Sequence, residues 1–233
     1  MRRLLQLKNK STLLAAPYSV WAIGFILIPL VLVIFYAFTD KTGSFTLDNI
    51  IAISESTNLK ALGLSVMLSF ISTIICLLLA YPLAMILATL GVNQSSFMVF
   101  IFILPMWMNF LLRTLAWQTL LEKTGVINSI LTFLNLPTLN IINTPSAIVL
   151  GMVYNFLPFM VLPIYNTLIK IDSNVINAAK DLGANNIQTF TRVIFPLSLP
   201  GVISGITMVF VPALTTFVIS DLLGGAKILL IGN

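Results

Sequence analysis

Histidine is absent from this chain of 233 residues, and cysteine occurs once, at Cys76. Without imidazoles and with a single thiol, the sequence offers neither a histidine-based catalytic site nor the ligands of a zinc cluster, and it can form no internal disulfide. Cys76 lies in an apolar run, so we interpret it as a small packing residue. A G-x-x-x-x-G-K-[ST] phosphate loop is also missing, since Gly224-Gly225-Ala226-Lys227 matches only a fragment of one. We therefore expect no cofactor, no metal and no ATP hydrolysis by this chain.

Charged residues are scarce as well. They make up 8% of the chain against 58% hydrophobic residues, whereas soluble domains carry about 25% charged residues. No charge occurs from Ala61 to Leu112 or from Thr124 to Ile169, and each run exceeds the roughly 20 apolar residues that cross a bilayer. The basic residues are scattered at the flanks of these runs, which argues against nucleic-acid binding. The sequence predicts an integral membrane protein in contact with lipid.

Five apolar segments are long enough to cross the membrane, at residues 13–38, 61–90, 97–121, 146–169 and 200–222. Helices are expected because lipid offers the backbone no hydrogen-bond partners and the segments lack the alternation of barrel strands. The basic start, MRRLLQLKNK, is similar to that of a signal peptide, but the apolar stretch after it is too long for one. The predicted fold is an all-α, polytopic membrane helical bundle that forms a single domain over residues 1–233.

The placement of lysine and arginine favours a cytoplasmic N-terminus. Most carboxylates then face outward, which makes the outer mouth the more acidic end. In this orientation the inner basic residues outnumber the outer ones: Arg2, Arg3, Lys8, Lys10, Lys170, Lys180 and Arg192 lie inside, and Lys41, Lys60, Lys123 and Lys227 outside.

Glycine and proline mark packing and bending points within the spans. Gly201 and Gly205 form a small-xxx-small pair, which permits close contact between membrane helices. Prolines inside the spans predict kinks, because each removes a backbone N–H from the helix. They are Pro29, Pro82, Pro105, Pro158, Pro163 and Pro212.

Residues 170–199 form the longest internal cytoplasmic loop in this topology. Ser173 is expected to cap a first short helix, which Gly183 ends in a left-handed turn. A second helix is expected to end before Pro196. Apolar residues recur on one side of both helices at spacings of three and four, which indicates an apolar ridge that either enters a partner's groove or rests on the membrane. The ridge comprises Val175, Ile176, Ala179, Leu182, Ile187, Phe190 and Ile194.

The stretch NAAKDLGANNIQTFTRVIFP at 177–196 resembles the EAA loop of ABC-importer permeases. Its alanines, glycine and proline keep the family spacing, with Val193 and Phe195 as apolar replacements, whereas Asn177 stands where glutamate is usual and puts a specific ion pair there in doubt. The resemblance implies that the loop docks onto a separate ATP-hydrolysing subunit. The implied coupling residues are Asn177, Ala178, Ala179, Leu182, Gly183 and Pro196.

The similarity extends to LPFMVLPIYNTL at 157–168 and SDLLGGAKILLIGN at 220–233, which resemble permease subunits of spermidine/putrescine importers. This implies a non-enzymatic, multi-pass subunit of the bacterial inner membrane. Its implied partners are a homodimer of the ATP-binding subunit, a second related permease and an external polyamine-binding protein. Such permeases usually have six spans, so we expect this five-span chain to be a truncated form, or else a natural variant.

A polyamine path needs carboxylates, aromatic faces and hydroxyl or carbonyl acceptors. Asp221 closes the fifth span, where a carboxylate is costly unless it faces a watery cavity or the outer interface. It is the first candidate for an ammonium contact, next to Ser220. Phe217, Tyr154 and Trp107 are weaker candidates, because each is more often a lipid-facing or packing residue than a ligand contact. Arg113 would repel a polyamine, so we interpret it as structural, bonded to carbonyls or reaching the interface.

Three alternatives stay open at this point. An ABC importer for another solute, such as ferric iron or a phosphonate, would share the same coupling loop. A secondary transporter would need acidic residues in the middle of its spans and often has internal repeats. A membrane-embedded enzyme would need a catalytic constellation, and the spans contain no paired carboxylates or histidine base.

Overall fold

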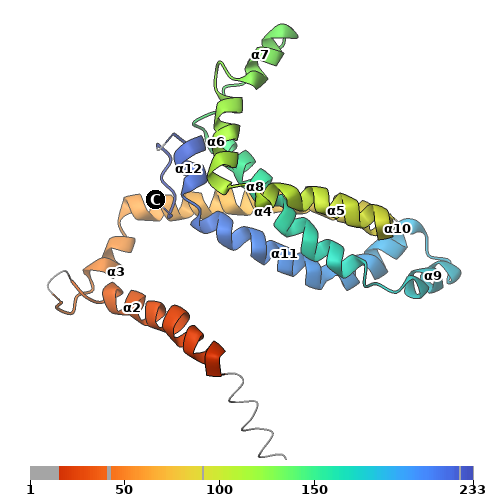
Figure 1. Cartoon of the computed structure of the whole chain (residues 1–233), viewed down its shortest axis with the longest axis horizontal. Helices are drawn as coiled ribbons and strands as arrows, with labels where there is room; N and C mark the ends of the chain where they lie inside the picture. The colour runs from red at the N-terminus through yellow and green to blue at the C-terminus, as the bar shows by residue number, and fades with distance from the viewer. Residues whose placement is uncertain (1–15, 41–42, 91, 226, 233) are drawn as a thin grey trace, which may run out of the picture. The chain divides into compact units, whose positions relative to one another are not determined.

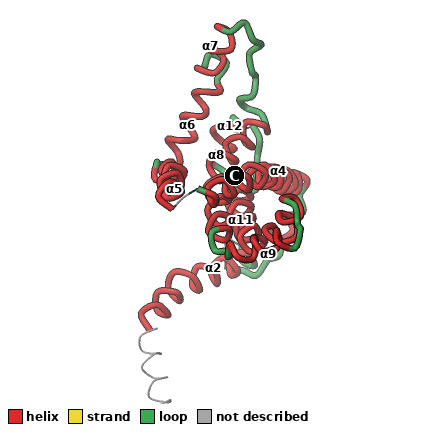
Figure 2. Tube along the Cα trace, turned by 90° about the vertical axis from the view of Figure 1, so that its right-hand side faces the viewer, coloured by secondary structure: helices red, strands yellow, loops and turns green. Residues whose placement is uncertain are grey.

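The computed structural model describes residues 16–40, 43–90, 92–225 and 227–232. It divides near residue 59 into two units. Within the described residues the structure is helical, apart from loops and an isolated antiparallel bridge between Thr39 and Phe45 (Figure 2). The predicted all-α class is confirmed.

The first unit consists of one long apolar helix and a short one. The long helix, Ala16–Ala37, contains a π-helical turn, η1 (Ile23–Leu27), and α2 (Ile28–Ala37), and neither of these two elements has a buried residue. After a turn, α3 (Asp48–Ile53) is tied back by Asn49, whose amide donates to the carbonyls of Tyr36 and Thr39 at 3.1 Å each. A long apolar helix without protein cover fits the first expected span.

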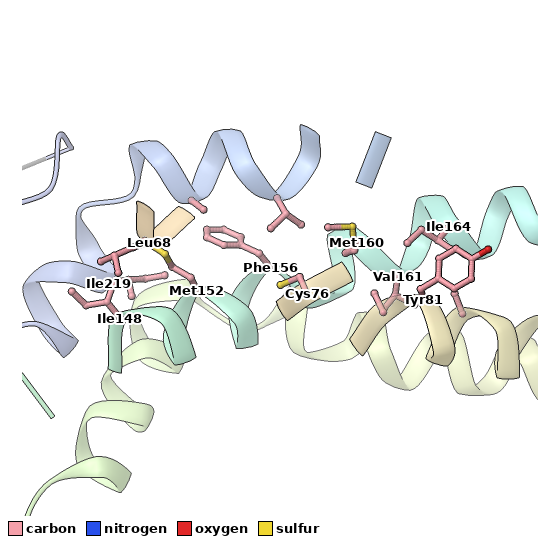
Figure 3. Close-up of a cluster of buried hydrophobic side chains, with 14 of the residues drawn as sticks. Leu68, Cys76, Tyr81, Ile148, Met152, Phe156, Met160, Val161, Ile164 and Ile219 are labelled. Carbon is pink, nitrogen blue, oxygen red and sulfur yellow. The ribbon is translucent and has the colours of Figure 1, made fainter. Parts of the chain in front are cut away.

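Three long helices form the core of the second unit: α4 (Ser56–Thr89), α8 (Pro145–Leu168) and α11 (Phe195–Thr215) (Figure 1). Small buried side chains of α4 contact α8. The Ser72 hydroxyl lies 3.4 Å from the Met152 sulfur, and the Cys76 sulfur lies 3.8 Å from the carbonyl oxygen of Val153. Figure 3 shows the cluster of buried side chains between the helices, with Cys76 and Met152 among them. Cys76 is fully buried, which confirms its expected packing role.

Two glycines set the approach of α11 to α8. A Cβ atom on Gly201 would lie 2.7 Å from the backbone oxygen of Pro163, and one on Gly205 would lie 2.7 Å from the Met160 sulfur. Both distances are shorter than a normal contact. At Gly201 the clash is with a backbone atom, so this position excludes a side chain at the present helix separation, whereas at Gly205 the flexible Met160 side chain would have to move. The expected close-contact role of Gly201 and Gly205 is confirmed.

The helix expected over 97–121 is interrupted at Met108 and Asn109. The chain forms α5 (Val92–Trp107) and α6 (Phe110–Leu121), with a bend of 90° between the segments Phe97–Trp107 and Phe110–Phe133. Asn109 starts the new helix, because its side-chain oxygen accepts hydrogen bonds from the backbone N–H of Leu111 at 2.9 Å and of Leu112 at 3.3 Å. A short amphipathic helix, α7 (Val126–Phe133), follows.

The fifth expected span, 200–222, also differs at both ends. Its helix starts earlier, since α10 (Asn186–Thr189) continues through a π turn, η2 (Phe190–Ile194), into α11. The expected stop before Pro196 is wrong: the π turn closes with a bond from the Phe195 N–H to the Phe190 carbonyl, and Pro196 falls in the first turn of α11, where proline is tolerated. At the other end, α11 stops at Thr215 and α12 (Val218–Leu223) forms separately.

Four helices of the described residues are long and apolar enough to cross a membrane, and a fifth span results if the bent pair counts as one. This agrees with the predicted polytopic membrane bundle.

Candidate functional site

Local hydrogen bonds define the hairpin formed by α9 (Ser173–Asp181) and α10. Asp172, and not Ser173 as expected, caps α9, because its carboxylate accepts from the backbone N–H of Asn174 at 2.9 Å. Gly183 has φ +84°, as its role in ending α9 requires. The N–H of Ala184 donates to Ala179 O at 3.0 Å and that of Gly183 to Lys180 O at 2.9 Å, which is the Schellman arrangement. A capping box between Asn185 and Gln188 then starts α10.

The expected apolar ridge of the hairpin divides into two faces. Ile176 and Ile194 face inward, where they line a cavity of about 230 Å³ with the ends of α4 and α8. The other side carries Val175, Leu182 and Ile187, which are 45%, 90% and 75% exposed. We call these three residues the outward apolar face. Of the remaining predicted coupling residues, Asn177, Ala178, Gly183 and Pro196 are exposed and Ala179 is half-buried.

Three aromatic rings join the hairpin to the bundle. Tyr81 of α4 lies 5.7 Å from Phe190 and 5.9 Å from Phe195 between ring centroids. Its hydroxyl is 2.7 Å from the Ser198 hydroxyl, which itself donates to the Phe195 carbonyl at 2.9 Å, so Tyr81 is the donor in this pair. Sequence reasoning missed Tyr81. The available signal was a tyrosine inside an apolar run, since a buried phenol needs a polar partner.

The candidates Asp221, Ser220 and Phe217 lie together at α12. Phe217 precedes the helix and is half exposed, while the buried Ser220 donates its hydroxyl to the Phe217 carbonyl at 2.7 Å. On the other side of α12, Ile219 lies against Gly151 of α8. Asp221 is exposed on the helix that this packing holds in place.

Tyr154 and Trp107 occupy different surroundings. The Tyr154 ring lies 5.2 Å from Trp117 and 5.7 Å from the Arg113 guanidinium, so a cation of the protein already occupies its neighbourhood. It also lines a cavity of about 400 Å³ between α4, α6 and α8. Trp107 ends α5, is 74% exposed and packs on Phe100. The contacts of Tyr154 with Trp117 and Arg113 favour a packing role for its ring over a cation–π contact with a substrate ammonium group.

Arg113 ties the two halves of the bent pair together. It is buried, and its Nη1 donates to the carbonyl oxygen of Pro105 at 2.6 Å, across the break between α5 and α6. The guanidinium also lies 6.0 Å from the Phe110 ring. The expectation that Arg113 bonds to a carbonyl is confirmed. In the part of the chain that the structure describes, His, Cys, Asp and Glu form no group able to hold a metal ion.

Comparison with known proteins matches residues 62–232 to the family described as "Binding-protein-dependent transport system inner membrane component". The chain belongs to this permease family. This permease is 40% identical over 221 residues to the spermidine/putrescine transport system permease protein PotB of Haemophilus influenzae, covering 91% of the chain and 77% of that protein. It is 38% identical to the protein of the same name from Escherichia coli K12, covering 91% of the chain and 80% of the relative.

A solved structure shares the fold of the permease. It is the crystal structure of a bacterial ABC transporter involved in the import of the acidic polysaccharide alginate, with a TM-score of 0.69 and 19% identity. The match covers 100% of this chain and 82% of the other. The predicted family resemblance is thus confirmed, and the permease is a multi-pass membrane subunit of a transport system.

Replacement of Arg113 by leucine is expected to destabilise the permease by about 1–2 kcal/mol, because the bond to the Pro105 carbonyl across the bend is lost. Thermal unfolding of the purified protein in detergent, at a fixed scan rate, measures the change. Lys123→Leu is the matched control, since it removes a cation from an exposed position after α6. An Arg113→Leu protein that unfolds at the wild-type temperature would contradict this role.

Proposed function

We propose that this permease is a membrane-spanning subunit of an ATP-driven importer for spermidine and putrescine. The proposal rests on the sequence identity of this chain, over 91% of its length, to two permeases that are named for spermidine/putrescine transport. Ferric iron and phosphonate importers remain the rival within the same family. A secondary transporter is less well supported, because the charge-free runs leave no carboxylate in the middle of a span.

Coupling to ATP hydrolysis is assigned to the α9–α10 hairpin. The chain has no phosphate loop, so the motor is a separate subunit, which we expect to be a homodimer. The outward apolar face is nine-tenths exposed at Leu182, which fits a helix laid into a groove of that partner. The Schellman turn at Gly183 fixes this face, and the three aromatic rings connect it to α4.

The assembly that we propose also contains a second, related permease and an external polyamine-binding protein. With the N-terminus in the cytoplasm of a bacterial cell, most basic residues fall on the cytoplasmic side of the inner membrane. The hairpin then lies in the cytoplasm, where the ATPase subunit is available. The α12 helix with Asp221 lies at the outer mouth, where substrate is released from the binding protein.

Asp221 is proposed as the first ammonium contact of the path. Asp221→Asn removes the charge but keeps the shape of the side chain and an acceptor oxygen. We therefore expect about three- to tenfold slower polyamine uptake, in line with the change from a charge-assisted to a neutral contact. Uptake into proteoliposomes and the yield of assembled complex are the two measurements. Glu122→Gln, which neutralises another exposed carboxylate of the outer side, is the control. Wild-type uptake by Asp221→Asn would remove Asp221 from the path.

The proposed function is tested by ATP hydrolysis of the reconstituted complex with its binding protein. The binding protein is loaded in turn with spermidine, putrescine, ferric iron and a phosphonate. Stimulation by the two polyamines is the expected result. Stimulation by another solute alone would assign the permease to that solute, and transport that continues without ATP would indicate a secondary transporter.

A further inference from the structure

A groove of about 490 Å³ lies between α5, α8 and α11 and does not include any of the residues discussed above as path candidates. Its volume falls within the range of about 300–1,000 Å³ that is typical of small-molecule sites. Its lining includes Met106, Phe159, Asn166, Ser204 and Met208. On α8 these residues come from the second half of the helix, and on α11 Ser204 and Met208 lie near its middle. In the proposed topology the groove therefore extends through the inner part of the membrane.

Polar side chains of largely apolar helices line this groove. Asn166 and Ser204 are both exposed, and among the described residues neither side chain has a hydrogen-bond partner. Thr207, one turn from Ser204, is different, because its hydroxyl is engaged with the Ile203 carbonyl at 3.0 Å. A polar side chain exposed on a membrane helix is costly unless it faces a watery cavity or a ligand. Asn166 and Ser204 thus supply acceptors that the fold itself does not use.

Two prolines add main-chain acceptors at the same groove. Pro163 follows Phe159 by four residues, and Pro212 follows Met208 by four. Because proline has no N–H, the carbonyls of these two lining residues lack their usual helical donor. The Phe159 ring offers in addition a face on which a cation can lie.

The groove has no fixed charge. The helices α5, α8 and α11 contain no Asp, Glu, Lys or Arg anywhere in their lengths. Ammonium groups are donors without acceptor capacity, so amide, hydroxyl and carbonyl oxygens are the partners that suit them. Neutral oxygens bind a cation more weakly than a carboxylate does, and a conducting path requires binding that is weak enough for release.

We propose that this groove is the inner part of the substrate path, where Asn166 and Ser204 contact the ammonium groups of the polyamine. The inference rests on the proposed function. Asp221 at the outer mouth would bind the polyamine first, and the neutral groove would bind it weakly enough to release it toward the cytoplasm.

The test places a fixed cation in the groove. Asn166→Lys is compared with Asn166→Met, which has a similar length and no charge, and both are assembled with the ATPase, the second permease and the binding protein. We expect Asn166→Lys to lower uptake about tenfold relative to Asn166→Met, through like-charge repulsion. The loss should be larger for the triamine spermidine than for the diamine putrescine, which a merely structural defect would not produce.

Ser204→Val and Thr207→Val form a second matched pair. Ser204→Val is expected to lower uptake about threefold through loss of one acceptor, whereas Thr207→Val, whose hydroxyl serves its own helix, leaves uptake unchanged. Complex yield should stay at the wild-type level in all four variants, and Thr207→Val should also keep the wild-type rate of basal ATP hydrolysis.

Equal uptake by Asn166→Lys and Asn166→Met would overturn the inference. So would a complex that fails to assemble with Asn166→Lys, because the groove would then hold a neighbouring subunit. Failure of the wild-type complex to transport polyamines would instead reject the proposed function itself, before any variant is compared.

Discussion

Replacement of Leu182 by glutamate is expected to weaken the association of the permease with its ATP-hydrolysing subunit about 100-fold, since a central interface residue contributes about 2–4 kcal/mol. Leu182 is 90% exposed, although it is a large apolar residue directly before the turn at Gly183. In the proposed groove of the partner, a carboxylate at this position would lose its hydrating water, at a cost that the apolar Leu182 side chain does not have. Binding of the purified ATPase subunit to the permease in detergent measures the loss.

Two further variants separate an effect on docking from an effect on the hairpin itself. Asn174→Glu adds the same charge to an exposed position in the first turn of α9, where a carboxylate suits the helix dipole. It should bind the ATPase subunit with nearly wild-type affinity, and so should Leu182→Met. If Asn174→Glu weakens binding as much as Leu182→Glu does, net charge and not the outward apolar face controls the association.

Replacement of Gly201 by alanine should destabilise the bundle by about 3 kcal/mol, at the upper end of overpacking effects. The new Cβ would lie 2.7 Å from the backbone oxygen of Pro163, so α8 and α11 must separate. Gly205→Ala meets mainly the sulfur of Met160, a flexible side chain that can move aside. We therefore expect a smaller loss of about 1 kcal/mol for Gly205→Ala.

Gly63→Ala is the control for this pair, because a Cβ atom at this position of α4 would have no atom of another part of the chain within 4 Å. Alanine also has a higher helix propensity than glycine, so this variant should be as stable as the wild type or more so. Thermal unfolding at a fixed scan rate ranks the three proteins. A Gly201→Ala protein as stable as Gly63→Ala would show that α8 and α11 can separate without loss.

The sequence was sufficient where one residue type alone permits the local geometry. Gly183 was predicted to take the left-handed conformation, and its φ is +84°. Gly201 and Gly205 were predicted to allow close helix contact, because only a missing side chain lets two backbones approach so closely. In both cases the glycines themselves, within a few residues of sequence, determine the local geometry.

The sequence was insufficient where a residue can serve two local structures. Asn109 is compatible with a span, but its side chain caps a new helix and produces the bend. The sequence predicts that a helix ends before Pro196, whereas the preceding π turn lets this proline lie in the first turn of α11.

Other features of the site depend on packing between distant segments. Periodicity identified the apolar residues of the hairpin, but it could not tell that Ile176 faces the ends of α4 and α8 while Leu182 faces outward. The sequence alone also could not show that the Arg113 guanidinium lies beside the Tyr154 ring, because the two residues belong to different helices. The sequence does not single out Asn166 and Ser204, because only the packing of two helices brings these isolated polar residues to one groove.

The unbroken helix from Asn186 to Thr215 has a mechanical consequence. Its 30 residues span about 45 Å at 1.5 Å per residue, from the second arm of the hairpin past Ser204 to the start of α12. If this helix tilts as a rigid rod about the hairpin, a tilt of about 5° would displace its far end by about 4 Å over that length. In the proposed topology, one tilt at the cytoplasmic end would thus move the groove wall at Ser204 and the outer end of the helix in the same movement.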